Sequence, residues 1–374
     1  MKKLSTNHFH QIVSRIIDQI EYAQHLTDEA PFFPKHIHIE PTNSCNLNCI
    51  HCIQKSMSRK RGLMEWDVYT RIIDEIAPLD CDISLDVQGE PLLHPKIIQM
   101  IAYAKEKGCF VSLLTNGTRL SEAISRSLIN LNLDRIVISF DAVEKELYEK
   151  VRINASFEKT LFNILKFIEL NYINKQQTFI CMSIILQKAT ETHIDTYKNY
   201  FNSLPINTIF VSQLLNMSGG SIIADEINLT EKKKRPLSEW PICRIGWENL
   251  TINWDGTVCP CPLDYNVFWP LGNIKEIPLY DMWNSKKLKQ FRRAQMDHNY
   301  LEIERKGTLC SQCSCLWDPE YDMKQYKNFA KQAIVRLSSQ YAKSLSVEKN
   351  DLAQNESDSK YQTLLNEICR YQKY

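Results

Sequence analysis

Three cysteines with the spacing C-x3-C-x2-C constrain this chain more than any other feature. Cys45, Cys49 and Cys52 follow the alternating polar and apolar residues 36–40, a pattern typical of a β-strand. The thiols are therefore expected on a loop that leaves a strand, where a rigid scaffold can present all three to one point. A four-iron cluster held by three cysteines has one iron without a protein ligand, and such an open position can bind a substrate or cofactor.

Two other interpretations of the triad stay open. A zinc knuckle would need His51 or a distant cysteine as the fourth ligand, although structural zinc sites usually use two paired ligand sets. A disulfide staple fits poorly, because three cysteines leave one thiol unpaired.

The motif resembles that of radical S-adenosylmethionine (radical SAM) enzymes. The resemblance implies that the open iron chelates the amino and carboxylate groups of S-adenosylmethionine. It also implies reductive cleavage to a 5′-deoxyadenosyl radical, which abstracts a hydrogen from the substrate. His51 stands where most members of the family carry an aromatic residue near the adenine, so we expect altered, but not abolished, cofactor binding.

The bulk composition excludes several classes of partner. The 374 residues carry 45 basic and 44 acidic side chains, a net charge of +1, so neither nucleic acid nor an anionic membrane is an expected partner. No apolar run is long enough for a membrane span, and the N-terminal residues lack the apolar core of a signal peptide. We therefore expect a cytoplasmic protein.

Thirteen cysteines in such a chain indicate metal or redox chemistry rather than disulfides. Nine of them form three groups, and the remaining four are expected to be small buried packing residues: Cys81, Cys109, Cys181 and Cys369.

Strand-like and helix-like segments alternate from residue 37 to about residue 214. Strands are predicted at 37–39, 83–87, 110–114, 135–140, 179–186 and 208–211. Helices are predicted near 66–77, 95–106, 120–130, 157–170 and 191–202. The alternation predicts an α/β fold with six βα units and a parallel sheet. Whether the sheet closes stays open from the pattern alone, and the resemblance implies a partial (β/α)6 TIM-like barrel.

Several polar motifs follow the predicted strands, at the sheet edge where parallel α/β folds bind ligands. The segments Gly89-Glu90-Pro91 and Thr115-Asn116-Gly117 both have the composition of ordinary turns. The resemblance implies contact of Gly89, Glu90 and Pro91 with the amino group of S-adenosylmethionine, and places Thr115 and Asn116 near the cofactor.

Two further residues are candidate cofactor contacts. The resemblance implies that Ser139 binds the ribose and that Arg152 lies near the cofactor carboxylate, which suits the bidentate geometry of a guanidinium. A surface salt bridge is the alternative for Arg152. Ser183 and Gln187, on the fifth strand and after it, are weaker candidates.

A second cysteine region lies between Cys243 and Cys315. Asp255-Gly256 is a hairpin turn that can bring Cys243 and Cys261 together. A helix is predicted around 282–295, and a C-x2-C follows at Cys310 and Cys313. Spacing alone fits a zinc site as well as an iron–sulfur cluster. The region resembles the SPASM or twitch auxiliary module, which implies Cys243, Cys261, Cys310 and Cys313 as ligands. Two 4Fe-4S clusters are then expected, one binding S-adenosylmethionine and one auxiliary, with Cys259 and Cys315 open as substitute ligands.

These features divide the chain into five expected parts. They are an N-terminal helical extension at 1–35 with a helix at 7–26, a radical SAM core at 36–215, a linker at 216–239, a SPASM/twitch domain at 240–323 and a C-terminal helical tail at 324–374. The tail is expected to hold a helix to about residue 345, a polar stretch at 347–360 and a short last helix at 361–374.

The expected activity is oxidation of a small sugar- or aminocyclitol-like alcohol, because the layout with a single auxiliary cluster is similar to that of 2-deoxy-scyllo-inosamine dehydrogenase. The alternative is modification of a ribosomally made peptide. Only 44 residues precede Cys45, too few for the N-terminal peptide-recognition domain that many such enzymes carry. A non-catalytic zinc-binding scaffold is a remote third hypothesis. The resemblance also implies a flavodoxin- or ferredoxin-type electron donor, while the sequence leaves the catalytic base unassigned.

Overall fold

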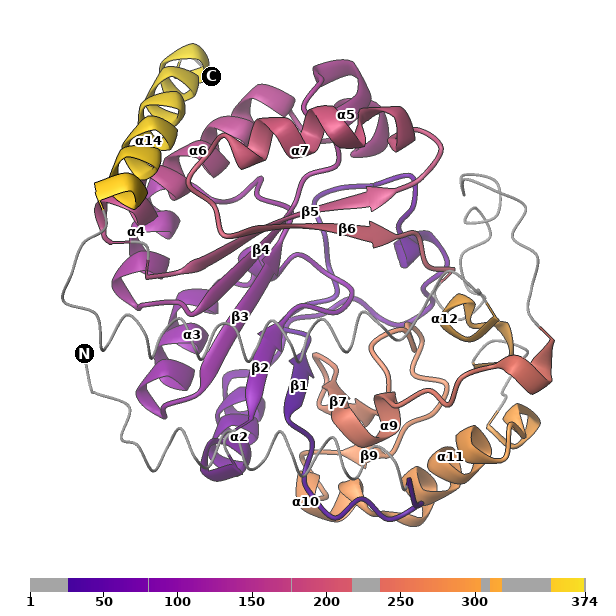
Figure 1. Ribbon diagram of the computed structural model, residues 1–374. Helices are drawn as coiled ribbons and strands as arrows, with labels where there is room; N and C mark the ends of the chain where they lie inside the picture. The colour runs from indigo at the N-terminus through magenta and orange to yellow at the C-terminus, as the bar shows by residue number, and fades with distance from the viewer. Residues whose placement is uncertain are drawn as a thin grey trace.

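Nine strands form a single sheet through the described part of the chain (Figure 1). The computed structural model describes residues 26–79, 81–175, 177–216, 236–303, 310–317 and 351–372. The strand order is β6-β5-β4-β3-β2-β1-β7-β8-β9. The first six strands are β1 (His36–Ile39), β2 (Asp82–Leu85), β3 (Phe110–Thr115), β4 (Arg135–Ser139), β5 (Phe179–Leu186) and β6 (Thr208–Gln213).

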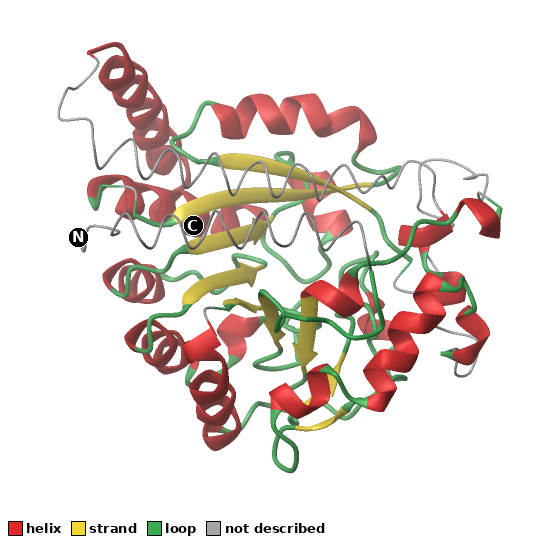
Figure 2. Cartoon of the chain, turned by 60° about the horizontal axis from the view of Figure 1, so that its bottom comes forward, coloured by secondary structure: helices red, strands yellow, loops and turns green. Residues whose placement is uncertain are grey.

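These six strands are parallel to one another, and helices cover one face of their sheet (Figure 2). The helices are α2 (Trp66–Ile76), α3 (Ile97–Glu106), α4 (Glu122–Asn130), α5 (Lys145–Val151), α6 (Phe157–Ile173) and α7 (Ile194–Asn202). Alternate strand residues such as Ile37, Ile83 and Val111 are fully buried in the core that the helices complete. The predicted βα units are confirmed, and the sheet stays open, as expected for a partial barrel. Helix α5 was not predicted.

The second cysteine region continues the same sheet. Strand β7 (Asn249–Ile252) pairs in parallel with β1, and β8 (Thr257–Cys259) pairs antiparallel with β7. Gly256 turns the hairpin with φ of 88°, a left-handed conformation that favours glycine. This predicted hairpin is confirmed, whereas the pairing of β7 with β1 was not predicted. The rest of the region comprises α9 (Ile245–Glu248), β9 (Gly272–Asn273), α10 (Leu279–Trp283), α11 (Lys286–Met296) and α12 (Ser314–Trp317).

Two helix predictions need correction. The helix expected around 282–295 is two helices, because the Ser285 hydroxyl accepts a hydrogen bond from Leu288 N and begins α11 anew. The last helix, α14 (Asp351–Tyr371), begins ten residues before the predicted start at 361. It packs on α6, with the Tyr172 and Tyr361 rings stacked at 4.2 Å between centroids.

Of the four isolated cysteines, Cys81, Cys109 and Cys181 are buried as predicted, whereas Cys369 on α14 is exposed. The prediction was wrong for Cys369, because α14 packs on α6 through a different face of the helix. Several predictions fall outside the described residues: the helix at 7–26 except its last residue, most of the linker at 216–239, and the helix between 321 and 345. The five domain boundaries stay predictions.

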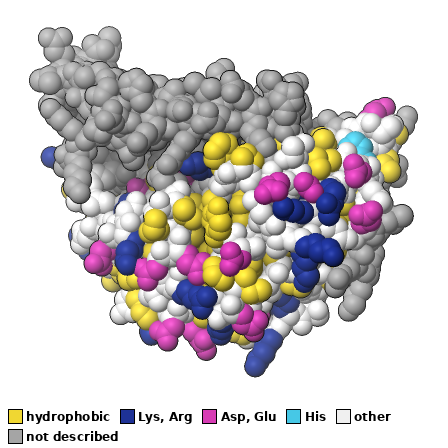
Figure 3. Space-filling model, turned by 90° about the horizontal axis from the view of Figure 1, so that it is seen from below, with side chains coloured by type: hydrophobic (Ala, Val, Ile, Leu, Met, Phe, Trp, Pro, Cys, Tyr) yellow, Lys and Arg dark blue, Asp and Glu magenta, His cyan; other side chains and the backbone are white. Residues whose placement is uncertain are grey.

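The described surface carries charges of both signs. On the face drawn in Figure 3, acidic and basic side chains lie among one another rather than in one single-sign patch. Among the described helices, none combines the length and the apolar character needed to cross a membrane.

Candidate active site and auxiliary cluster site

The loop that carries the first cysteine triad begins where β1 ends. It is fixed to the chain after α5, because Asn48 N donates to Ile153 O and Ile50 N donates to Val151 O, each at 3.0 Å. Cys52 N donates to Cys49 O at 3.2 Å, which makes the loop compact.

The three thiols share one electrostatic environment. Burial raises the pKa of Cys45, Cys49 and Cys52, and each is also raised by at least one other thiol of the triad. The thiols are thus gathered at the carboxyl end of β1. As thiolates they would gain strongly from binding a cationic metal centre, because burial alone disfavours their charge.

The segment after β2 packs directly on this loop. Glu90 N donates to Ser44 O at 2.9 Å, and a Cβ atom on Gly89 would lie only 2.0 Å from Thr42 O. Glycine is therefore required here by close approach of two backbone segments. Pro91 begins a 3-10 turn, η3 (Pro91–Leu93). The structure thus places Gly89, Glu90 and Pro91 beside the cysteine loop.

Glu90 connects this segment to the end of β3. Its buried carboxylate accepts hydrogen bonds from Thr115 Oγ1 and Asn116 N, both at 2.7 Å. Asn116 Nδ2 in turn lies 3.8 Å from Cys45 Sγ and 3.2 Å from Asn46 Oδ1. Burial raises the pKa of Glu90 despite these hydrogen bonds. The three candidate residues Glu90, Thr115 and Asn116 therefore form one hydrogen-bonded group next to the triad.

Arg152 forms a buried ion pair that the sequence did not reveal. Its Nε lies 2.8 Å from Asp141 Oδ2, and Asp141 also accepts from Ile185 N at 2.9 Å. Burial acts to raise the pKa of Asp141, but the charge of Arg152 and the two hydrogen bonds bring it below its usual value. The Arg152 charge also acts on Cys49 and Glu90, which places the guanidinium among the triad and cofactor residues. The alternative of a surface salt bridge was wrong, because both partners are buried.

Ser139 ends β4 and pairs in register with Ser183 of β5, so both lie on the face opposite the helices. Gln187, after β5, is fully buried, and neither its Nε2 nor its Oε1 has a hydrogen-bond partner within the described residues. His51 Nδ1 is also buried and finds no partner in the described ranges, and burial lowers the pKa of His51 to about 4, so the ring is neutral. Because buried polar atoms are normally hydrogen-bonded, these groups fit the presence of a polar cofactor at this edge of the sheet.

A row of polar residues crosses the open face of the sheet. In the strand register, five residues on adjacent strands lie side by side: Thr251 of β7, His38 of β1, Ser84 of β2, Ser112 of β3 and Arg135 of β4. His38 Nδ1 lies 2.9 Å from Asp86 Oδ2. Thr251 Oγ1 and Arg135 Nε are buried and have no hydrogen-bond partner among the residues that the structure describes. Sequence reasoning missed this row, since only the His36–His38 alternation gave a local signal.

Four cysteines gather in the second region. Burial raises the pKa of Cys243, Cys261 and Cys310, and the pKa of Cys261 is also raised by Cys243, Cys313 and Cys310. The four residues implied by the resemblance are thus brought together. Cys259 is in a different setting on β8, where its sulfur contacts Cys261 O at 3.5 Å and Asn253 Nδ2 at 3.7 Å.

Within the described residues, no three His, Cys, Asp or Glu side chains converge as a single metal ion would require. A four-iron cluster separates its ligands by its own width and needs no such convergence. Four mutually interacting thiols fit an iron–sulfur cluster.

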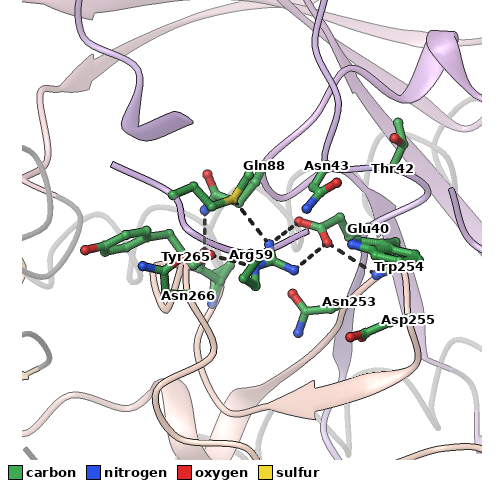
Figure 4. Close-up of polar contacts among 12 residues, drawn as sticks. Glu40, Thr42, Asn43, Arg59, Gln88, Asn253, Trp254, Asp255, Tyr265 and Asn266 are labelled. Carbon is green, nitrogen blue, oxygen red and sulfur yellow. Dashed lines mark hydrogen bonds and ion pairs between the residues drawn. The ribbon is translucent and has the colours of Figure 1, made fainter. Parts of the chain in front are cut away.

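A polar contact joins the two cysteine regions (Figure 4). Arg59 donates from both terminal nitrogens to the fully buried Glu40 carboxylate, at 2.9 and 2.7 Å, and from Nε to Tyr265 O at 2.7 Å. Gln88 Nε2 donates to Pro262 O at 3.1 Å. The segments that follow Cys52 and Cys261 are therefore held against each other.

The fold and the two cysteine sites define an iron–sulfur protein built on an open parallel α/β barrel. Residues 39–197 match the radical SAM superfamily, and residues 243–314 match the SPASM iron–sulfur cluster-binding domain. The chain belongs to the radical SAM superfamily and carries a SPASM domain. These assignments imply S-adenosylmethionine and two 4Fe-4S clusters as its cofactors.

Two curated proteins illustrate the sequence similarity. The tungsten-containing aldehyde ferredoxin oxidoreductase cofactor-modifying protein of Pyrococcus furiosus is 24% identical over 326 residues, 75% of this chain and 87% of the relative. The PqqA peptide cyclase of Granulibacter bethesdensis is 24% identical over 274 residues, 66% of this chain and 72% of the relative.

Two solved structures share the fold. BtrN in complex with AdoMet and 2-DOIA has a TM-score of 0.53 at 20% identity, covering 75% of this chain and 93% of BtrN. Streptococcus suis SuiB bound to precursor peptide SuiA has a TM-score of 0.58 at 15% identity, covering 75% of this chain and 71% of SuiB. At these identities the likeness shows the fold alone.

Proposed function

We propose that this radical SAM enzyme modifies a peptide substrate. The observation that carries the proposal is the similarity to a peptide cyclase over about two thirds of this chain. The structure of SuiB, which has the same fold and is bound to precursor peptide SuiA, supports the proposal. The expectation of a sugar- or aminocyclitol-like substrate thus becomes the second candidate, favoured by the fold shared with BtrN and by the four-cysteine auxiliary site. A dehydrogenase-type reaction belongs to that second candidate.

The candidate site residues fall into two groups, one for each cluster site. Cys45, Cys49 and Cys52 would hold the cluster whose open iron binds S-adenosylmethionine. Gly89, Glu90, Pro91, Thr115, Asn116, Ser139 and Arg152 would form the cofactor's polar surroundings. When bound, cluster and cofactor supply a reagent that abstracts hydrogen from unactivated carbon. Cys243, Cys261, Cys310 and Cys313 would hold the auxiliary cluster, and a flavodoxin- or ferredoxin-type protein would deliver electrons.

Arg152 has a defined electrostatic task in this arrangement. Held by Asp141, the guanidinium presents a fixed positive charge to Cys49 and to the Glu90 group. It therefore favours anionic ligands at the triad, both thiolates and the carboxylate of S-adenosylmethionine. The polar row of His38, Ser84, Ser112, Arg135 and Thr251 offers hydrogen-bonding groups to a substrate on the open face.

The test is iron content and cofactor cleavage in anaerobic protein reconstituted with iron and sulfide. About eight irons per chain are expected from two four-iron clusters. The Cys310→Ala variant should lose only the irons of the auxiliary cluster. Cys49→Ala should abolish formation of 5′-deoxyadenosine from S-adenosylmethionine and dithionite, measured by mass spectrometry. An unchanged iron count in Cys310→Ala would reject the auxiliary ligand assignment.

The substrate class is tested separately. Deuterium-labelled peptides encoded beside the gene and a labelled aminocyclitol would each be incubated with the reconstituted enzyme. Transfer of deuterium into 5′-deoxyadenosine from the peptide supports the proposal. Transfer from the aminocyclitol alone would favour the second candidate.

A further inference from the structure

Gln295 lies against a ligand of the auxiliary site. It is on α11 and fully buried, and its Nε2 donates to Cys310 Sγ at 3.0 Å. Its Oε1 is buried and has no hydrogen-bond partner in the part of the chain that the structure describes. A cysteine that ligates iron is a thiolate, which accepts hydrogen bonds but donates none. Only the NH2 end of the amide can therefore satisfy this contact, and that is the orientation found.

Tyr300 approaches the same thiols from the next element, the 3-10 turn η6 (Tyr300–Glu302). Only 4% of the residue is exposed, and its hydroxyl has no hydrogen-bond partner among the described residues. The ring is held by Trp240, with centroids 5.3 Å apart, and is stacked with His298 at 6.1 Å. Burial raises the pKa of Tyr300, so the phenol is protonated. The turn η6 packs against the 3-10 turn η7 (Cys310–Gln312), which places the phenol on the Cys310 side of the auxiliary site.

A buried donor beside sulfur atoms has a physical consequence if those atoms belong to a cluster. Buried hydroxyls and amides almost always have partners, so an unpartnered phenol here indicates an acceptor such as cluster sulfur. Hydrogen bonds to the sulfurs help to set the potential of iron–sulfur clusters. A donor stabilises the reduced state most, because that state carries one more negative charge.

We propose that Gln295 and Tyr300 donate hydrogen bonds to sulfur atoms of the auxiliary cluster and raise its reduction potential. The Gln295 donor goes to Cys310, and the Tyr300 hydroxyl goes to a cluster sulfur atom on the Cys310 side of the site. Both are positioning residues that act through the cluster. The proposal rests on the SPASM domain and not on the identity of the substrate, so it can hold or fail independently of the proposed function.

The test compares Gln295→Met and Tyr300→Phe with the unaltered enzyme. Methionine keeps the length of glutamine without the donor, and phenylalanine removes only the hydroxyl. Tyr265→Phe is the matched control, because Tyr265 lies in the same module and its pKa is raised by burial and by Asp264, not by these cysteines. Iron content is measured first, so that every protein compared carries both clusters.

The potential of the auxiliary cluster is then followed by electron paramagnetic resonance during a reductive titration. The signal that S-adenosylmethionine alters identifies the other cluster, whose potential should not change. Each variant should shift the auxiliary equilibrium about tenfold toward the oxidised state, as loss of a hydrogen bond to a charged group predicts. That is a fall of about 59 mV for a one-electron couple.

Each result has a defined meaning. A fall in both variants, with Tyr265→Phe unchanged, supports the proposal. A fall in only one variant restricts the donor role to that residue and overturns it for the other. Unchanged potentials in both, or an equal fall in the control, overturn the proposal.

Discussion

At the scale of single residues, the structure assigns partners that spacing could not. Arg152 was predicted near the cofactor carboxylate, and its observed partner is Asp141, eleven positions earlier at the end of β4. The sequence places both residues near strand and helix ends but gives no sign that they meet. The ion pair is fully enclosed, so removal of one partner leaves an uncompensated buried charge.

Asp141→Asn should therefore destabilise the protein strongly. The neutral amide leaves the Arg152 charge buried, for which a loss of about 3–5 kcal/mol is expected. The measurement is the midpoint of urea unfolding of the anaerobic protein. Glu158→Gln is the control, because Glu158 pairs with the exposed Lys145 and such pairs contribute about 0–1 kcal/mol. Equal midpoints for the two variants would contradict the assignment.

His94 should make stability depend on pH. Its Nε2 lies 3.0 Å from Met64 O and its Nδ1 accepts from Lys96 N at 3.1 Å, so the hydrogen bonds require the neutral ring. Burial lowers the pKa of His94 in the folded state. The unfolded chain then binds more protons as the pH falls through about 6.5, so the folded state loses stability below that pH.

Replacement of His94 by glutamine should flatten this dependence. Urea midpoints at pH 7 and pH 5 give the slope, and the decrease toward pH 5 should be smaller in His94→Gln than in the unaltered protein. The comparison isolates His94 because His36, whose pKa burial also lowers, is present in both proteins. Parallel slopes would rule out the role of His94.

At the scale of elements, local patterns predicted most of the core. All six strands of the barrel were placed, because β-branched runs bounded by turns are local signals. Helix α5 was missed since it has only seven residues, too few for a clear periodic pattern. The pairing of β7 with β1 joins residues more than 200 positions apart, and no local pattern encodes it. Gln295 and Tyr300 were missed for the same reason, because only the packed module brings them to the cysteines.

The contact between Arg59 and Glu40 should depend on geometry as well as charge. Lysine keeps the charge but cannot reproduce the two parallel hydrogen bonds or the third bond to Tyr265 O. Arg59→Lys is expected to lose part of the stability, and Arg59→Met should cost about 3–5 kcal/mol by leaving Glu40 buried and unpaired. Urea unfolding orders the three proteins. The interpretation fails if lysine is as stable as arginine.

At the scale of the whole molecule, the SPASM region is attached to both margins of the open barrel. On one side β7 pairs with β1, and the Arg59 contact reinforces that junction (Figure 4). On the other side Asn216, just beyond β6, accepts from Ser314 N at 3.0 Å and donates through Nδ2 to Gln312 O at 2.6 Å. The region therefore bridges the gap that an open sheet leaves, and this second attachment holds the segment that carries Cys310 and Cys313.

Asn216→Ala should loosen only the second attachment. Without the side-chain amide, residues 310–317 lose two of their hydrogen bonds to the barrel and should exchange backbone hydrogens faster, while β7 and β8 keep their protection. Asn266→Ala is the matched control on the opposite side, because Asn266 Oδ1 accepts from Ser58 N at 2.8 Å. Hydrogen exchange with mass spectrometry of the anaerobic enzyme separates the two variants, and iron release to a chelator should be faster in Asn216→Ala alone. If both variants loosen the same segment, or neither loosens residues 310–317, the region is not held by two separate attachments.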